Sequence, residues 1–196
     1  LQHKSELQSL LSAVKSRRDE QAIATKQLAP PLLVKIAPDL TDQDKDDIAE
    51  VALRVGLDGL IISNTTIERD PHLRSPQQNE VGGLSGAPLK HKSTQLIHDM
   101  YKRTQGQLVI IGVGGVENGL DAYEKIRAGA SLVQIYSSFV YGGPYIVHLI
   151  KRDLSQLLQR DGFRNVSEAV GSSHRNGNTT IQRNQANNLL IGPRSE

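Results

Sequence analysis

The stretch QLVIIGVGGV, residues 107–116, determines how the rest of the chain is interpreted. Its apolar residues 108–111 run directly into glycines, which predicts a buried strand that opens into a tight loop. A second apolar run, residues 132–135, predicts a neighbouring buried strand. The segments that follow these two strands carry glycines and hydroxyl side chains: Gly114, Gly115, Tyr136, Ser137 and Ser138. Because glycine lets backbone N–H groups approach a phosphate without an intervening Cβ, we predict a compact anion pocket there.

The composition of the chain excludes several classes of function. Its 196 residues are 37% hydrophobic, which suits one domain with a sizeable core. The 23 Lys and Arg residues nearly balance the 21 Asp and Glu residues, and no basic stretch carries interleaved aromatics, so nucleic acid is not an expected partner. The absence of cysteine excludes disulfides and thiolate sites. The histidines lack metal-ligand spacing, so we expect no metal, and His91 and His98 are expected on a solvated helix face.

Helices and strands alternate along the chain. An amphipathic helix opens it, and four units follow, each with a short apolar strand and a helix. The predicted strands are residues 32–37, 60–62, 108–111 and 132–135. The corresponding helices are predicted after the caps Thr41 and Asn118, around residues 96–101, and after Pro144. No apolar run is long enough to span a membrane.

Repeated strand and helix units predict an α/β fold with a parallel sheet. An open doubly wound sheet is one alternative, but polar residues and glycines after each strand favour a (β/α)8 TIM barrel, in which every βα loop faces the same side. A full barrel takes about 250 residues, so the chain is expected to supply about half of one. We predict the half-barrel over residues 1–171 and a flexible tail, rich in Asn, Gln, Arg and Ser, over 172–196. The opening helix has no strand before it, so we expect further sequence upstream or on another polypeptide.

Two candidate binding positions follow the first two predicted strands. Lys35 lies inside an apolar strand, where an unpaired ammonium is costly. It either projects into water or meets an anionic partner, and the sequence does not choose between the two. Asn64 and Thr65 offer paired donors and acceptors that suit the imide edge of a small heterocycle. An Asx or Thr turn that ends the strand is the simpler interpretation of this pair.

The remaining candidates are hydroxyl residues and glycines that offer groups to a phosphate: Ser85, Gly86, Gly114, Gly115 and Ser137. One glycine turn alone is weak evidence, but such residues recur after every strand, which favours a functional interpretation. A core ring with an exposed hydroxyl is the alternative interpretation of Tyr136. Residues 68–81 form a polar loop that is either a lid over a site or a surface insertion without a role.

Five motifs occur in order along the chain: VKIAPDLT (residues 34–41), SNTT (63–66), GGLSGAPL (82–89), IIGVGGV (110–116) and GASLVQIYSS (129–138). Together they resemble the quinone-dependent class of the dihydroorotate dehydrogenase family. The resemblance runs in register from the first residues to about Arg175 and does not cover the tail. It implies that the chain supplies the C-terminal half of a (β/α)8 barrel that binds FMN.

The resemblance also implies an activity and residue roles. The activity is oxidation of (S)-dihydroorotate to orotate in pyrimidine (UMP) biosynthesis, with ubiquinone as the electron acceptor. Lys35 matches a lysine beside the isoalloxazine ring, where its charge stabilises the reduced flavin. Asn64 and Thr65 match the pair that binds the pyrimidine. The other FMN contacts are implied for Ser63, Ser85, Gly86, Gly114, Gly115, Tyr136 and Ser137.

One feature of the family has no match in this sequence. Quinone-dependent members use a serine base within the pattern Asn-x-Ser-Ser-Pro-Asn, which does not occur in residues 1–196. We therefore expect the catalytic base, the N-terminal half of the barrel and the membrane-associated quinone-tunnel helices upstream of Leu1. The chain alone is not expected to be active. The implied location is the mitochondrial inner membrane, or the cytoplasmic membrane in a bacterium.

Two alternatives stay open. Related flavin barrels, such as dihydropyrimidine dehydrogenase or the soluble dihydroorotate dehydrogenases, could share the glycine loops, although the soluble class carries a cysteine base and a different sequence around Lys35. A non-catalytic half-barrel that binds only a phosphate ligand or a partner is the other alternative.

Overall fold

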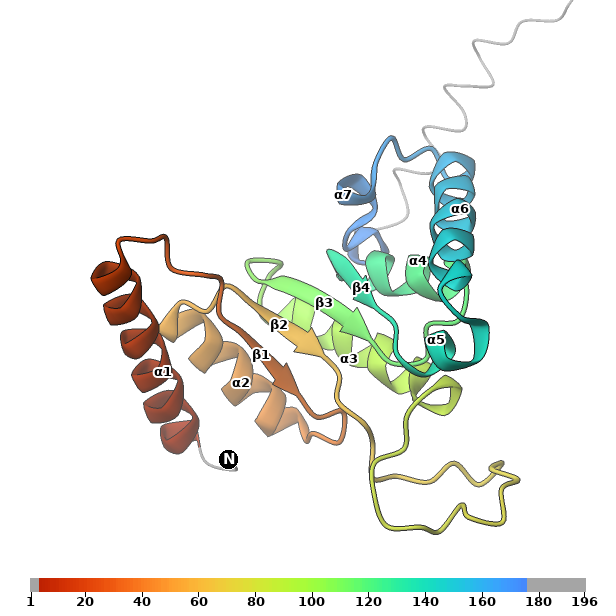
Figure 1. The fold of residues 1–196 in the computed structure, drawn as a ribbon, viewed down its shortest axis with the longest axis horizontal. Helices are drawn as coiled ribbons and strands as arrows, with labels where there is room; N and C mark the ends of the chain where they lie inside the picture. Colours follow the sequence, from red (N-terminus) through yellow and green to blue (C-terminus); the bar gives the residue numbers. More distant parts are fainter. Residues whose placement is uncertain (1–3, 176–196) are drawn as a thin grey trace, which may run out of the picture.

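A computed structural model describes residues 4–175 as an α/β fold in which helices alternate with parallel strands (Figure 1). The strands are β1 (Leu33–Ile36), β2 (Gly59–Ile62), β3 (Val109–Val113) and β4 (Leu132–Gln134). The longer helices are α1 (Lys4–Thr25), α2 (Asp42–Val55), α3 (Lys90–Arg103), α4 (Gly119–Ala128) and α6 (Tyr145–Arg160). The short ones are α5 (Ser137–Gly142), α7 (Val166–Ala169) and the 3-10 turns η1 (Ala87–Leu89) and η2 (Ser172–His174). All four predicted strands are present, with slightly shifted bounds.

The four strands form one parallel sheet in the order β1-β2-β3-β4. An open doubly wound sheet reverses its strand order at a switch point, and no reversal occurs among these four strands. Consecutive parallel strands, each followed by a helix, are the arrangement of a (β/α)8 barrel. The structure therefore supports the barrel over the doubly wound alternative, with the described strands forming an arc of it.

The two faces of the sheet have different surroundings. Successive residues of a strand point to opposite faces. The core between the sheet and helices α2 and α3 includes Ile36, Leu60, Ile62, Ile110, Val51, Ala52, Leu96, Ile97 and Met100. On the opposite face, Lys35, Val109 and Leu132 are exposed. Within residues 4–175, helices therefore cover one face of the sheet, and the other face is open.

The helix ends follow the local signals that the sequence carries. Thr41 caps α2 through a capping box with Asp44, and Gly56 ends this helix with a φ of 69°. Asn118 caps α4 by accepting a hydrogen bond from the Asp121 N–H. The predicted caps at Thr41 and Asn118 are confirmed. None of the helices in the described part of the chain is both long enough and apolar enough to cross a membrane.

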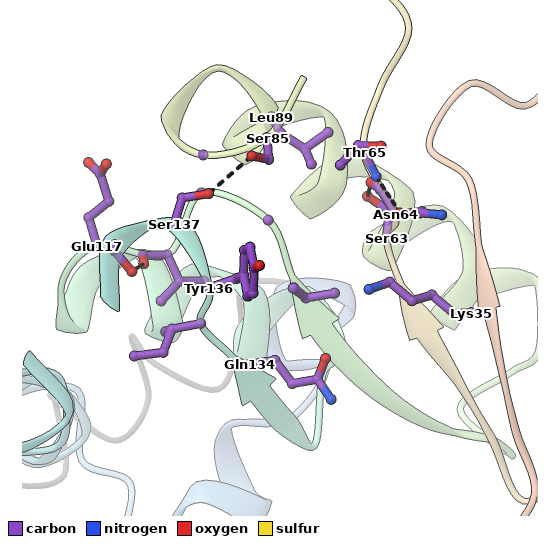
Figure 2. A pocket seen from close by; sticks show the side chains of 17 residues that line it. Lys35, Ser63, Asn64, Thr65, Ser85, Leu89, Glu117, Gln134, Tyr136 and Ser137 are labelled. Atoms are coloured by element: carbon purple, nitrogen blue, oxygen red, sulfur yellow. Dashed lines mark hydrogen bonds between the residues drawn. The ribbon is translucent and has the colours of Figure 1, made fainter. Parts of the chain in front are cut away.

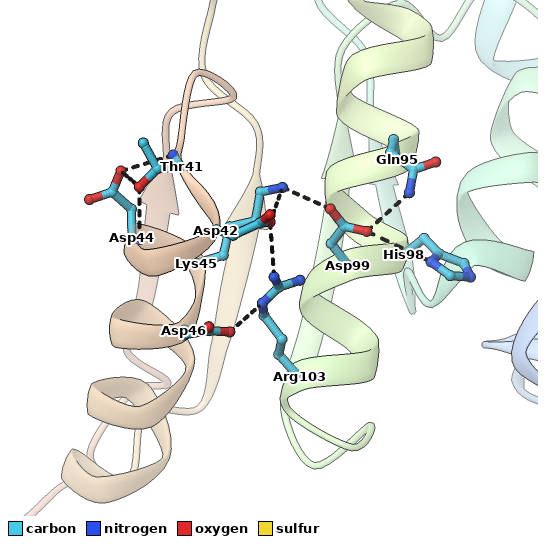
Figure 3. Close-up of polar contacts among 9 residues, drawn as sticks. All are labelled: Thr41, Asp42, Asp44, Lys45, Asp46, Gln95, His98, Asp99 and Arg103. Carbon is cyan, nitrogen blue, oxygen red and sulfur yellow. Dashed lines mark hydrogen bonds and ion pairs between the residues drawn. The ribbon is translucent and has the colours of Figure 1, made fainter.

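Ion pairs join α2 to α3 along their polar sides (Figure 3). The Lys45 ammonium lies 2.9 Å from Asp99, and the hydrogen bond from Lys45 to Asp99 raises the pKa of this lysine. Arg103 pairs with Asp46 at 2.6 Å. These contacts connect two helices that cover neighbouring strands, and their residues do not line the cavity described below.

Two helices differ from the prediction. Helix α1 continues to Thr25 and buries only Leu11, while Leu10 and Val14 stay more than 40% exposed. The reason is that α1 packs chiefly against α2, so only a small part of its apolar stripe is covered. Helix α5 was not predicted, because six residues are too few to show helical periodicity.

His91 and His98 were expected on a solvated helix face; His91 is exposed, but His98 is only partly exposed. Its ring stacks on the His174 ring, with centroids 3.9 Å apart. His174 and Ser173 reach back to the last carbonyls of α4, since Ser173 Oγ donates to Arg127 O at 2.8 Å. The first residues of the predicted tail, 172–175, are therefore packed rather than flexible. The rest of that tail, residues 176–196, lies outside the described residues.

Candidate functional site

A cavity of about 240 Å3 opens at the carboxyl ends of the strands (Figure 2). All ten residues that the sequence singled out for the site line it: Lys35, Ser63, Asn64, Thr65, Ser85, Gly86, Gly114, Gly115, Tyr136 and Ser137. These residues come from five separate segments of the chain, so the parallel sheet brings them together. Their individual roles in binding stay predictions.

Lys35 supplies a positive charge to this cavity. It lies on the open face of β1, and its side chain points toward the turn at residues 63–65 (Figure 2). Among residues 4–175, no carboxylate forms an ion pair with the Lys35 ammonium. Lys35 therefore projects from the sheet, and an anionic ligand as its partner stays a prediction. The charge of Lys35 is therefore available to an anionic ligand.

The turn after β2 presents Asn64 and Thr65. The Asn64 N–H donates to Ile36 O at 2.8 Å and the Ser63 N–H donates to Val113 O at 3.1 Å, so the turn is tied to the ends of β1 and β3. Asn64 Oδ1 accepts the N–H of the next residue, Thr65, at 2.9 Å, whereas an Asx turn would bond the N–H two residues on. In the part of the chain that the structure describes, the Asn64 amide nitrogen has no partner. This donor therefore remains available in the cavity.

Asp39 anchors the segment that leaves this turn, and sequence reasoning missed it. It accepts hydrogen bonds from Thr66 Oγ1 at 2.6 Å and from the Ile67 N–H at 2.8 Å, and it pairs with Lys92 of α3. Burial alone would raise the pKa of Asp39, but the hydrogen bonds from Lys92, Thr66 and Ile67 bring it below the ordinary value. Asp39 thereby fixes the start of the polar loop beside the cavity. Its sequence signal was a carboxylate directly after a strand.

Glycine loops and serine hydroxyls form the other end of the cavity (Figure 2). Ser85 Oγ and Ser137 Oγ lie 3.1 Å apart and link two of these loops. Gly114 and Gly115 have φ values of 112° and 67°, which side-chain-bearing residues rarely adopt. A Cβ on Gly115 would lie 2.5 Å from Lys90 Cβ, so this loop packs directly on the start of α3. Only glycine fits at this position.

Ser138, which the sequence placed in the anion pocket, also lines the cavity, together with residues that the sequence did not single out: Leu89, Val113, Val116, Glu117, Gln134 and Ile135. Gln134 carried the same signal as Lys35, a polar residue inside an apolar strand. The alternative interpretation of Tyr136 as a core ring is wrong, because this residue is 79% exposed. By the alternation of β4, Tyr136 continues the open face of Gln134.

The two ends of the cavity offer different chemistry. A cation and a free amide donor lie near β1 and β2, and glycine N–H groups and hydroxyls lie near the ends of β3 and β4. This arrangement suits an elongated ligand with a planar polar head and a phosphate at the far end. No cluster of His, Cys, Asp or Glu within residues 4–175 is arranged to hold a metal ion.

Comparison with known proteins relates this chain to one enzyme family. The family model described as dihydroorotate dehydrogenase matches residues 1–158. Among curated proteins, the dihydroorotate dehydrogenase (quinone) of Rhodospirillum rubrum is 54% identical over 175 residues, which are 89% of this chain and 47% of that protein. The mitochondrial dihydroorotate dehydrogenase (quinone) of Mus musculus is also 54% identical, over 89% of this chain and 44% of the mouse protein.

A solved structure gives the same relation in three dimensions. The crystal structure of DHODH from Eimeria tenella in complex with ferulenol matches with a TM-score of 0.84 and 48% identity. The match covers 89% of this chain and 50% of that chain. This chain therefore spans about half the length of the relatives it matches.

Proposed function

The chain belongs to the dihydroorotate dehydrogenase family, and on that premise we propose that it forms the FMN-binding and substrate-binding half of a quinone-dependent dihydroorotate dehydrogenase. The proposed reaction is oxidation of (S)-dihydroorotate to orotate in pyrimidine biosynthesis, with ubiquinone as the electron acceptor. The similar proteins are named as quinone enzymes, which supports this class over the soluble one. The observation that carries the proposal is the convergence of ten candidate residues, from five segments, on one cavity.

The donor set of the cavity fits FMN. Glycines with positive φ leave backbone N–H groups without Cβ cover, and Ser85 and Ser137 add hydroxyls. Ser85, Gly86, Gly114, Gly115, Tyr136 and Ser137 would hold the phosphate and ribityl groups, and Ser63 would make a further contact with FMN. When bound, FMN supplies a two-electron acceptor for the hydride of the substrate. Lys35, which has no carboxylate partner among the described residues, would stabilise negative charge on the flavin ring.

Asn64 and Thr65 would bind the pyrimidine. The free amide donor of Asn64 and the hydroxyl of Thr65 can pair with carbonyl oxygens of a ring placed beside the flavin. The turn around them is fixed to β1 and β3 by backbone hydrogen bonds, so their positions are set before the ligand binds. These residues orient the substrate, and none of them is assigned as the catalytic base.

The open face of the sheet exposes apolar side chains that a further segment would cover. Val109 and Leu132 are 44% and 59% exposed, and burying such side chains would stabilise the protein. The N-terminal half of the same barrel is the proposed cover, since the relatives are about twice as long as this chain. We place the serine base and the membrane-associated quinone helices in that half. Residues 1–171 would then be the C-terminal half-barrel, followed by the polar segment 172–196.

Location follows from the same relatives, which are mitochondrial in some organisms and bacterial in others. We propose attachment to a membrane that holds the quinone, either the mitochondrial inner membrane or the bacterial cytoplasmic membrane. Cell fractionation with detection of this chain tests the assignment.

The enzymatic proposal is tested with the protein that contains this chain, purified in detergent. It should show a flavin absorption spectrum that bleaches when dihydroorotate is added, and a ubiquinone analogue should restore the spectrum. Restoration by fumarate or NAD instead would assign the soluble class. A colourless protein that binds phosphate but not flavin would favour the non-catalytic half-barrel and contradict the proposal.

A further inference from the structure

Lys125 of α4 is a lysine with a fully buried side chain, and no carboxylate forms an ion pair with it among residues 4–175. Its ammonium donates instead to Ser93 Oγ at 2.6 Å, to Thr94 Oγ1 at 2.9 Å and to Lys90 O at 3.4 Å. All three acceptors are neutral oxygens in the first turn of α3. Burying a charge among neutral groups is costly, so packing alone does not explain a lysine here.

Ser93 connects this ammonium to the glycine loop. Its Oγ lies 3.1 Å from Gly114 O and 3.1 Å from Lys90 O, but a hydroxyl has only one proton to donate. Lys90 O already accepts from the Thr94 hydroxyl and from Lys125. Gly114 O has no other donor in the described part of the chain. Because Lys125 occupies an acceptor site of Ser93, the Ser93 proton is directed to Gly114 O.

The orientation of one peptide group follows from this contact. The peptide between Gly114 and Gly115 is trans, so its C=O and N–H point in opposite directions. Ser93 is fully buried and does not line the cavity, so the Gly114 carbonyl is held away from the cavity. The Gly115 N–H then points to the other side. No acceptor for it is present among residues 4–175.

A second contact holds the far end of the same loop. Asp121 of α4 accepts the Glu117 N–H at 2.9 Å and pairs with Lys90 of α3 at 2.9 Å. Its side chain is 2% exposed. The loop from Gly114 to Glu117 is therefore held at both ends: Ser93 of α3, which is bonded to Lys125, contacts Gly114, and Asp121 of α4 contacts Glu117.

We propose that Lys125 is a positioning residue for the phosphate of the cofactor: acting through Ser93, it fixes the Gly114 carbonyl and so presents the Gly115 N–H to the phosphate. This inference rests on the proposed function, because the phosphate is that of FMN. Lys125 touches neither the cofactor nor the substrate in this assignment. Its contribution is the orientation of one backbone donor.

The test compares FMN with riboflavin, which has the same ring and ribityl chain but no phosphate. Flavin is removed from the whole enzyme, and the affinity for each flavin is measured by fluorescence quenching. Lys125→Met, which has a similar length but no donor, should weaken FMN binding about 10-fold, because one oriented donor to a charged group is lost. Riboflavin affinity should not change. Ser93→Ala should reproduce this selective loss, and the double variant should lose no more than either single variant.

Lys45→Met is the matched control, because Lys45 also joins two helices but is only partly buried and does not line the cavity. It should bind both flavins as the unmodified enzyme does. The melting temperature of each flavin-free variant is recorded, so a general loss of structure is recognised by equal loss of FMN and riboflavin affinity. Equal loss, or unchanged FMN affinity in both Lys125→Met and Ser93→Ala, overturns the inference. If the unmodified enzyme binds no FMN, the proposed function is wrong. If it binds FMN and only the predicted effects of the variants are missing, the inference about Lys125 is wrong and the proposed function stands.

Discussion

Lys35 and Lys125 lie on opposite sides of the loops at the carboxyl end of the sheet, and neither forms an ion pair within residues 4–175. Lys35 is exposed and faces the cavity, whereas Lys125 is fully buried behind it and bonded to three neutral oxygens. An exposed cation without a partner costs the fold little and is available to a ligand. A buried one lowers the stability of the fold, and its presence is explained by what it holds in place.

The loop between the two lysines should show the largest effect. Gly115→Ala places a Cβ 2.5 Å from Lys90 Cβ at a residue whose φ is 67°. Backbone strain and the clash together should lower the free energy of unfolding by about 2–4 kcal/mol. The loop must shift, so FMN affinity should fall about 100-fold or more. Urea denaturation and flavin titration measure the two effects.

Gly162→Ala is the control for strain without a clash. Gly162 has a φ of 77°, but nothing lies within 4 Å of a Cβ built there. This variant should lose about 1 kcal/mol of stability and keep its FMN affinity. If Gly115→Ala behaves like Gly162→Ala, the close packing of the glycine loop on α3 does not matter for FMN binding.

The buried Lys125 should change how the stability of the fold depends on pH. Burial lowers the pKa of Lys125 to about 8, from 10.5 in the unfolded chain, against the raising effect of Asp121 and Glu124 and with a further lowering effect of Lys90. Between these two values the unfolded state binds the proton and the folded state does not, so this group makes stability rise with pH. The cost is fully present below pH 8 and amounts to at most about 3 kcal/mol.

Other groups also titrate in this range, so the measured quantity is the difference between the unmodified enzyme and Lys125→Met. The variant should be as stable or more stable at pH 7, and the difference should shrink as the pH rises toward 10. The FMN affinity of the unmodified enzyme should fall as the pH rises toward 10, because the neutral Lys125 amine binds Ser93 more weakly than the ammonium does. A difference in stability that does not vary with pH would contradict the buried charge.

The contrast between the two lysines also separates what the sequence could predict from what it could not. Lys35 was recognisable because a charge within an apolar strand is a local signal, and the caps Thr41 and Asn118 are local signals too. Parallel strands bring their carboxyl ends together, so the residues predicted at the strand ends line one cavity. Strand order and register therefore explain why the ten residues meet, whereas the choice of Ser63 and the roles of the set came from the family resemblance.

Lys125 gave no such signal. On the sequence it is one lysine of a helix with an ordinary polar pattern, and its partner Ser93 lies 32 residues earlier on another helix. Contacts of this kind depend on how two helices meet, which periodicity does not encode. The stacking of His98 on His174 was missed because it also joins segments that are distant in the sequence, whereas Asp39 was missed although it follows a strand directly. Gln134 was missed although its signal was local.

The exposed lysine is tested by removing its charge. Lys35→Met should weaken FMN binding about 10-fold, because the cation faces the cavity without a competing carboxylate. The free energy of unfolding should change by less than about 0.5 kcal/mol, as for other exposed side chains. Lys35→Arg keeps the charge and should recover part of the affinity. A large loss of stability in Lys35→Met would mean that this lysine supports the fold, as Lys125 does not.

Asn64 gives the smallest and most selective effect, on the same side of the loops as Lys35. Its Oδ1 closes the turn by accepting the Thr65 N–H, and its amide nitrogen is the group left for the substrate. Asn64→Asp keeps the oxygen and removes the donor, whereas Asn64→Ala removes both. If the donor binds dihydroorotate, both variants should raise KM about 5-fold to 10-fold with FMN affinity unchanged. If only the turn matters, Asn64→Asp should keep the normal KM while Asn64→Ala raises it. The order of the two variants therefore decides whether this residue, like Lys35, acts on a ligand or serves only the local backbone.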